Sequence, residues 1–348
     1  MRATVVSIFL VMGCAKPAVL PEIDAYLTRA IDSLQAKALE RRSVDWEAVR
    51  SEAYDMARGA TSLVETYPII RHVLSSLHDN HSFLQLSDSL RQAEIRALGN
   101  AGDSEASAPP SPSPFGTRMQ AEFALLETPG NSVGFVFMPQ GIRDDAFATA
   151  FQSEMATLSA AAPCGWIVDL RGNGGGNMWP MLAGLGPVLG NTELGGSVDA
   201  DGRTSTWIYR KGSAIYRHPD GLEETYAQVQ QEPLELNTSH PIAVLHDRGT
   251  GSSGEAMAIS FRGHTITRSF GEMTSGSSTS TRGMRLSDGA NMVVATAVFT
   301  DRNGVTYPNG LEPDQLVPSG SSIPERDQDR AVLEALQWLS TTAACGPS

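Results

Sequence analysis

The spacing of apolar residues divides this chain into an N-terminal helical part and a later part in which strands and helices alternate. Between residues 21 and 79, apolar positions recur every three or four residues, which is the period of amphipathic helices. We expect one helix around 26–34, a second that begins near Ser43 and runs past 46–57, and a third that opens at Tyr67-Pro68 and covers 69–77. The pattern therefore predicts a small helical bundle.

The later part has the pattern of an α/β core. It begins with a strand over 133–138 and a helix over 144–158. Residues 166–170 form a nearly continuous apolar strand of the kind that is buried on both faces, followed by a glycine-rich turn and a helix over 178–189. Further elements are expected as a hairpin over 205–216, strands at 242–245, 266–270 and 292–300, and a closing helix over 330–339.

A stretch rich in Pro, Ser, Gly and acidic residues separates the two parts. Residues 99–118 are too polar and too often broken by proline to pack, so we expect a flexible linker there. The chain is accordingly divided into a targeting segment (1–18), an N-terminal helical domain (19–98), the linker (99–118) and an α/β core (119–348).

The first residues have the composition of an export signal. Arg2 precedes the apolar run 5–12, which ends in Gly13-Cys14, and this resembles a bacterial lipoprotein signal in which the cysteine is lipidated. Ordinary cleavage near Ala15 or Ala18 and a buried N-terminal strand are the alternatives. Either export route places the protein outside the cytoplasm, in the cell envelope or periplasm with or without a lipid anchor, or in the medium.

Composition excludes some classes of function. The chain has 348 residues and a net charge of -13, without a basic stripe, which argues against a general nucleic-acid binder. Beyond the N-terminus, no apolar run approaches the roughly 18 residues that a membrane span needs. Cys164 and Cys345 are compatible with a disulfide in an oxidising compartment and equally with two separate thiols. His78 and His81 lack a third ligand nearby, so we expect neither a metal nor another cofactor.

Two glycine-rich turns carry the candidate chemistry. Residues 249–255 follow a strand and open a helix, which places Ser252 at a helix N-terminus, where unpaired amides can stabilise an oxyanion. The simpler interpretation is a capping box between Ser252 and Glu255. The second turn, 172–176, implies a backbone that another group approaches closely. Neither turn has the spacing of a dinucleotide-binding loop or the lysine of a phosphate loop, which leaves an anion- or oxyanion-binding nest.

Four segments in one order resemble the tricorn and C-terminal processing peptidase family of serine peptidases. They are His81 after a helix, the DLRGNGGG run at 169–176, the pair 249–255 and 271–276, and the NGLEPD turn at 309–314. The likeness covers roughly residues 20–340. It implies an α/β fold with a ClpP/crotonase-like catalytic core, and no PDZ domain fits between the motifs.

The resemblance implies a role for each candidate residue. Ser252 is the nucleophile, and the oxyanion hole is formed by the amide of Ser253 and that of Gly175 or Gly176. The branch that uses a lysine base has it 25 residues after the serine, where this chain has Ser277, so His81 takes the role of base as in the tricorn-like branch. Asn80 or Ser82 is expected to orient His81, and Glu312 is the nearest candidate for the orienting acid.

These expectations predict a secreted or lipid-anchored serine endopeptidase. It would hydrolyse peptides or unfolded proteins through an acyl-enzyme on Ser252. The alternative from another class is a weak or inactive relative that binds peptides or hydrophobic ligands on the same scaffold. Ester hydrolysis by the same residues is a further alternative.

Overall fold

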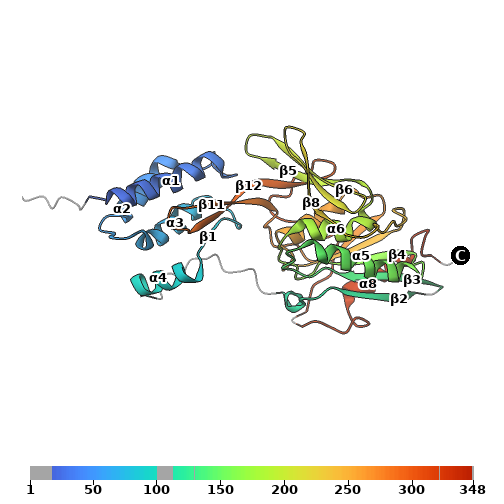
Figure 1. Ribbon diagram of the computed structural model, residues 1–348. Coiled ribbons are helices and arrows are strands. Elements are labelled where there is room, and N and C mark those ends of the chain that lie inside the picture. The colour runs from blue at the N-terminus through green and yellow to red at the C-terminus, as the bar shows by residue number, and fades with distance from the viewer. Residues whose placement is uncertain (1–17, 100–112, 129, 321, 347–348) are drawn as a thin grey trace, which may run out of the picture.

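The computed structural model describes residues 18–99, 113–128, 130–320 and 322–346. Figure 1 shows helices gathered at one end of the molecule and a larger core of sheets and helices at the other, with strands β11 and β12 running between them. The expected targeting segment, with Cys14, lies outside the described residues except for Ala18. No helix in the described ranges is long and apolar enough to cross a membrane.

The helical part contains the predicted bundle. Its main helices are α1 (Pro21–Lys37), α2 (Trp46–Met56) and α3 (Tyr67–Ser75), followed by β1 (Phe83–Gln85) and α4 (Asp88–Leu98). Its hydrophobic cluster is completed by side chains from much later in the chain, namely Leu286, Ala290, Met292 and Val294. The helices therefore pack around a hairpin that the later part contributes, and the boundary at residues 98 and 119 does not describe this packing.

The hairpin is formed by β11 (Thr279–Arg285) and β12 (Asn291–Asp301). One end of β12 pairs with β1 of the helical part, and the other end pairs with β5 (Thr192–Asp199) of the core. At the hairpin tip, Asp288 accepts hydrogen bonds from the hydroxyls of Tyr26 (3.2 Å) and Tyr67 (2.7 Å). The hairpin thus joins the two parts of the molecule.

The core is built on a six-stranded sheet in the order β13-β10-β9-β4-β3-β2. All its neighbouring strands are parallel except β2 and β3. The strands are β2 (Glu122–Thr128), β3 (Asn131–Phe137), β4 (Gly165–Asp169), β9 (Ile242–His246), β10 (Thr267–Gly271) and β13 (Gln315–Leu316).

Both faces of this sheet are covered, as the sequence predicts for 166–170. Val168 packs into the cluster shared with α5 (Asp145–Ser159), α6 (Met178–Leu189) and α7 (Ser253–Ser260). Ile167 packs into the opposite cluster with α8 (Arg330–Ser340). Successive residues of a strand point to opposite faces, so a strand covered on both sides must be apolar throughout.

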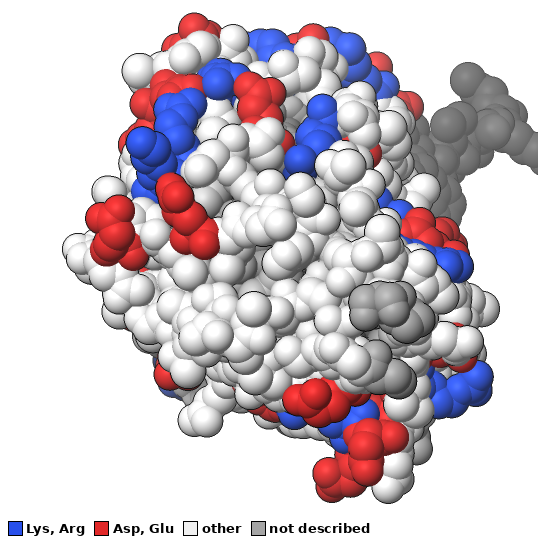
Figure 2. All heavy atoms as spheres, turned by 90° about the vertical axis from the view of Figure 1, so that its right-hand side faces the viewer, with Lys and Arg blue, Asp and Glu red and all other residues white. Residues whose placement is uncertain are grey.

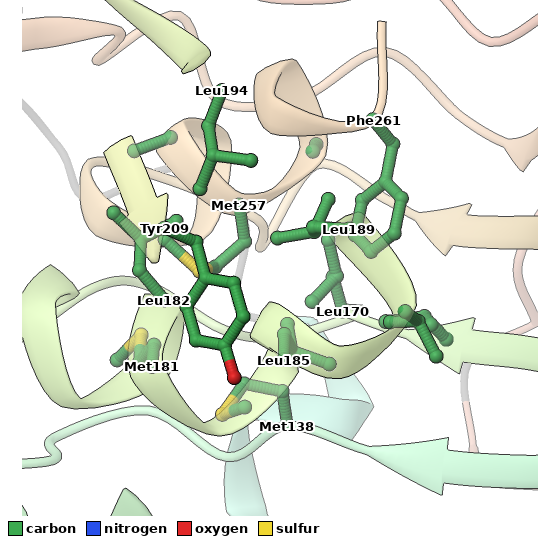
Figure 3. Close-up of a cluster of buried hydrophobic side chains, with 14 of the residues drawn as sticks. Met138, Leu170, Met181, Leu182, Leu185, Leu189, Leu194, Tyr209, Met257 and Phe261 are labelled. Atoms are coloured by element: carbon green, nitrogen blue, oxygen red, sulfur yellow. The ribbon is translucent and has the colours of Figure 1, made fainter. Parts of the chain in front are cut away.

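The second sheet runs from the core toward the helical part. Its order is β1-β12-β5-β6-β7-β8, with β11 also on β12. The predicted hairpin corresponds to β6 (Thr204–Arg210) and β7 (Ser213–Arg217), and β8 (Glu223–Gln228) forms the far edge. Figure 3 shows Tyr209 from this sheet lying among side chains of α6. A Cβ at Gly186 would come within 2.0 Å of the Tyr209 ring, so only glycine permits this contact.

Part of the expected linker packs on the core. Residues 100–112 lie outside the described ranges, but Pro114–Thr117 form a short 3-10 helix. Phe115 is 2% exposed and lies under the guanidinium of Arg171, 4.0 Å from the ring centre. The sequence pattern does not reveal this contact, since a single aromatic residue between prolines gives no periodic signal.

Covalent and charged features complete the fold. Cys164 and Cys345 form a disulfide that ties the end of the chain after α8 to the start of β4. This decides between the two states that the sequence left open. Figure 2 shows the end of the core that faces away from the helices, where basic and acidic side chains lie together at the margins of a broad uncharged area.

Candidate active site

Ser252 occupies a strained turn between β9 and α7. Its backbone φ is 52° and ψ is -118°, a region that residues with a side chain seldom occupy. The turn is closed by Gly254 N–H, which donates to the carbonyl of Gly251 at 2.8 Å. Non-glycine residues at such angles cost about 1–3 kcal/mol and persist where the surroundings hold them, which is often at functional sites.

Ser252 and Glu255 have the geometry of a capping box, as the simpler interpretation predicts. Glu255 Oε2 accepts a hydrogen bond from Ser252 N–H at 3.0 Å, as a capping box requires. The Ser252 hydroxyl faces the Glu255 amide but forms no close side-chain cap hydrogen bond. The hydroxyl therefore remains available for other chemistry.

Glu255 joins the Ser252 turn to the loop that follows β10. Its carboxylate is fully buried and also accepts hydrogen bonds from Thr274 Oγ1 (2.6 Å) and Gly276 N–H (2.9 Å). Burial raises the pKa of Glu255 to about 7, and the hydrogen bonds from Thr274, Gly276 and Ser252 act in the opposite direction. One carboxylate thus fixes two segments of the site.

The glycine-rich loop after β4 lies directly against Ser252, as the sequence predicts for a backbone that must be approached closely. A Cβ at Gly175, whose φ is 114°, would be 2.9 Å from Ser252 Cβ. A Cβ at Gly254 would be 2.0 Å from the carbonyl oxygen of Asn173. The group that approaches this loop is therefore the turn that carries the predicted nucleophile.

Two backbone amides beside Ser252 have no hydrogen-bond partner among the described residues. They are Gly176 N–H and Ser253 N–H, the latter at the N-terminus of α7. Gly175 N–H, in contrast, donates to Asn173 Oδ1 at 3.0 Å. The Ser253 hydroxyl donates to the Gly176 carbonyl at 2.6 Å, and this bond links the two residues that carry the free amides. Free amides at a helix N-terminus favour a negatively charged oxygen.

Buried polar contacts hold the two glycine-rich loops together. Asp247 Oδ1 accepts from the amides of Gly172 (2.9 Å) and Gly249 (3.0 Å), one from each loop. Arg171 forms buried ion pairs with Asp169 and Asp329 at the start of α8. These contacts with buried core residues therefore fix the geometry of both loops.

His81 lies in a tight turn before β1. Asp79 Oδ1 accepts from the backbone amides of His81 (2.8 Å) and Ser82 (2.6 Å), and the Ser82 hydroxyl accepts from Ala295 N–H of β12 at 3.0 Å. His81 Nδ1 lies 2.8 Å from Thr279 Oγ1. Burial lowers the pKa of His81, and the nearby Asp79 opposes this shift. The ring is consequently neutral at pH 7 and can accept a proton.

The His81 ring and the Ser252 turn are both linked to one short segment, residues 276–279. Gly276 N–H bonds to Glu255, which holds the Ser252 turn, and Thr279 contacts His81. Three residues of chain span at most about 10 Å. Ser277, which stands where the lysine branch has its base, lies in this segment. No hydrogen bond directly joins His81 to Ser252 within the described part of the chain.

Other residues expected at the site lie differently. Glu312 is on an exposed turn, and its carbonyl accepts from the Arg262 side chain; the ring of His81 meets Thr279 instead. Asn80 is exposed, whereas Ser82 organises the turn by contacts with Asp79 and β12. No group of three His, Cys, Asp or Glu side chains in the described ranges could hold a metal.

Thr279 is the site residue that the sequence did not reveal. It is 198 positions away from His81, and it is 8% exposed in a strand that the pattern did not predict. The only hint in the sequence was that Thr279 stands two residues after Ser277, the position at which the lysine branch has its base. The role of Glu255 as a bridge between two segments is likewise visible only in the fold.

Comparisons with known proteins identify the family of the chain. Residues 132–317, more than half of the chain, match the model of peptidase family S41. The nisin-resistance protein of Lactococcus lactis subsp. lactis is 24% identical over 323 residues, which cover 92% of this chain and 88% of that protein.

Solved structures share the fold over most of their length. A lipoprotein from Streptococcus agalactiae has a TM-score of 0.59 at 20% identity, covering 97% of this chain and 99% of that one. The photosystem II D1 C-terminal processing protease also gives 0.59, at 18% identity over 94% and 99% of the two chains. The resemblance inferred from the motifs is confirmed, as is an α/β fold with N-terminal helices. The chain belongs to peptidase family S41.

Proposed function

We propose that this protein is an exported serine endopeptidase with Ser252 as nucleophile and His81 as general base. The observation that carries the proposal is the Ser252 turn itself. It presents a hydroxyl without a close cap hydrogen bond beside two unpartnered amides, those of Gly176 and Ser253. A helix cap alone needs neither the positive φ nor the second free amide.

The reaction follows from these positions. Ser252 Oγ attacks the carbonyl carbon of a peptide bond while its proton passes to His81 Nε2. The negative oxygen of the tetrahedral intermediate accepts hydrogen bonds from Ser253 N–H and Gly176 N–H. We favour Gly176 over Gly175 because the Gly175 amide already donates to Asn173. His81 then protonates the leaving amine, and water hydrolyses the acyl-enzyme by the reverse proton path.

Thr279 supports the role of His81. When Thr279 Oγ1 accepts the hydrogen on Nδ1, the lone pair on Nε2 is free to act as a base. The ring and the Ser252 hydroxyl are not hydrogen-bonded here, so the two groups must come closer when a substrate binds. The hairpin that joins the two parts is the element along which such an approach would occur.

Three observations support export. The N-terminal sequence has the pattern of a signal with Cys14 as a lipidation site. The disulfide between Cys164 and Cys345 is typical of an oxidising compartment. A structural relative is a lipoprotein. We therefore place the protein in the cell envelope.

A fluorophosphonate probe tests the proposed chemistry. The wild-type protein should be labelled on Ser252, Ser252→Ala should not be labelled, and His81→Ala should react at least about 1,000-fold more slowly. Both variants should fold, because Ser252→Ala removes at most a helix cap of about 1 kcal/mol and His81→Ala removes one side-chain hydrogen bond, to Thr279. An unlabelled wild-type protein would instead support a ligand-binding relative without activity, and labelling of Ser252→Ala would exclude this nucleophile.

A second, narrower candidate concerns the substrate. The similarity to a nisin-resistance protein extends over 92% of this chain and thus includes the helical part with His81. We infer that nisin is a candidate substrate. Incubation with nisin, followed by mass spectrometry, should reveal a cleaved product with the wild-type protein and intact nisin with Ser252→Ala. Intact nisin in both samples would reject this substrate and leave the peptidase proposal open.

A further inference from the structure

An apolar pocket opens beside the loop that supports the free Gly176 amide. It has a volume of about 290 Å³ and lies between α5 and the segments that flank β2 and β3. Its lining includes Met119, Phe123, Pro139, Ile142, Phe147 and Ala150. Among its lining residues, all of which are described, the only ionisable one is Glu154. Met119 is 61% exposed, so the pocket is open to solvent.

The wall of this pocket is bonded to the glycine-rich loop. Gly141 N–H donates to the Gly175 carbonyl at 2.7 Å, and Asn177 N–H donates to the Ile142 carbonyl at 2.9 Å. A Cβ at Gly176 would be 3.1 Å from Gly141 Cα. The chain segment that lines the pocket therefore also braces the two residues next to Ser252.

The same contacts bring the pocket close to the nucleophile. Gly175 touches Ser252, Gly141 is bonded to Gly175, and a Cβ at Gly141 would be 3.9 Å from Met119 Cε. With the covalent bonds inside Gly175 and Gly141 included, this path is about 15 Å long at most, which an extended peptide crosses in about four to five residues. A substrate whose carbonyl lies at Ser252 can therefore reach the pocket with a nearby side chain.

We propose that this pocket is a specificity subsite that takes one large apolar side chain of the peptide substrate, aromatic or long aliphatic. The inference depends on the proposed peptidase function and adds the substrate class. The volume is at the small end of ligand pockets, about 300–1,000 Å³, which suits a single side chain. The wall of the pocket is hydrogen-bonded to the loop that carries the Gly176 amide, so a peptide bound at Ser252 is the occupant that we favour.

The chain itself offers a poor alternative occupant. Residues 100–112, which precede the pocket in sequence, contain only Asn, Ala, Gly, Asp, Ser, Glu and Pro. This composition includes no aromatic or long aliphatic side chain that gains from burial in an apolar pocket.

The test fills the pocket and leaves the nucleophile intact. Ala150 is an exposed residue of α5 that lines the pocket, and Ala150→Trp would occupy it; Ala156→Trp adds the same side chain to an exposed position of the same helix outside the pocket. For matched peptides that carry Phe or Ala at one position near the scissile bond, the wild-type protein should favour Phe in kcat/KM. Ala150→Trp should lower kcat/KM for the Phe peptide about 10- to 100-fold and leave the Ala peptide nearly unchanged. Ala156→Trp should behave as wild type.

Two further measurements separate this inference from the proposed function. Fluorophosphonate labelling of Ala150→Trp should proceed at the wild-type rate; normal labelling with unchanged preference for Phe would overturn the subsite but not the peptidase. Binding of the same peptides to Ser252→Ala needs no catalysis. Tighter binding of the Phe peptide that is lost in the Ser252→Ala/Ala150→Trp double variant supports the pocket even if the protein proves inactive. Equal binding of both peptides would reject it.

Discussion

The two parts of this molecule hold their share of the site in different ways. In the core, the Ser252 turn is fixed by the buried carboxylate of Glu255 and by a glycine-rich loop that Asp247 ties down. In the helical part, the His81 turn is partly exposed and depends on Asp79, Ser82 and Thr279. A nucleophile and its oxyanion amides must be placed accurately, and close packing around a buried network provides this.

The two parts also have separate hydrophobic clusters, so each can respond to a perturbation on its own. The helical part has its own hydrophobic cluster, and the later chain enters it through the hairpin tip near Asp288. The core has separate clusters on the two faces of its parallel sheet. We therefore expect perturbations of one part to leave the other folded, with the hairpin as the common element.

The largest effect is expected for the disulfide of the core. Cys164→Ala/Cys345→Ala removes a link between positions 181 residues apart and should lower the free energy of unfolding of the core by about 2–5 kcal/mol. Urea unfolding followed by tryptophan fluorescence can measure this, since four of the five tryptophans lie in the core and only Trp46 lies in the helical part. Hydrogen exchange in 21–75 should be unchanged. Faster exchange there would show that the two parts are not independent.

The hairpin tip provides the converse test. Asp288→Asn removes the charge that accepts from the hydroxyls of Tyr26 and Tyr67, which should cost about 1–3 kcal/mol in the helical part. Hydrogen exchange should accelerate in α1 and α3 and stay slow in β4 and β9. Glu232→Gln, an acid-to-amide change at an exposed core position, serves as the control. Equal destabilisation of the core by Asp288→Asn would show that the core and the helical part do not unfold independently.

Glu255→Gln tests the bridge inside the core. The amide group would present a donor to Ser252 N–H, so we expect about 1–2 kcal/mol of destabilisation and labelling about 10-fold slower. The wild-type carboxyl has its pKa raised from 4.5 to about 7, so the folded state binds a proton more tightly than the unfolded chain. The contribution of this group to stability is therefore present below pH 4.5 and is lost as the pH rises through 7. Unfolding free energies measured across this range should show that slope in the wild type and lack it in Glu255→Gln.

The smallest effect is expected at Thr279. Thr279→Val keeps the shape but removes the oxygen at His81 Nδ1, which should slow labelling up to about 10-fold with little loss of stability. Thr279→Ser should restore the rate. Because the pKa of His81 is lowered by burial, the wild-type rate should hold at pH 6.5 and fall only in more acidic buffer. A rate already halved at pH 6.5 would mean that the ring is solvated like a free histidine.

Local sequence signals were sufficient to predict several elements of the fold. The buried strand at 166–170, the helix over 178–189 and both glycine-rich turns could be predicted because apolar period and glycine spacing report on neighbouring residues. The combination of motifs also sufficed to identify the family. Ser252 and His81 became candidates in this way, and their roles remain predictions that the proposed labelling tests.

Contacts between groups that are distant in sequence are visible only in the folded molecule. The tertiary structure paired Cys164 with Cys345, placed Thr279 beside His81 and brought Asp288 into the helical cluster. These contacts join positions about 180 to 220 residues apart, and nothing in the local pattern of either segment encodes its partner. Such pairings follow from how the sheets and helices pack around shared hydrophobic clusters, which is a property of the whole chain.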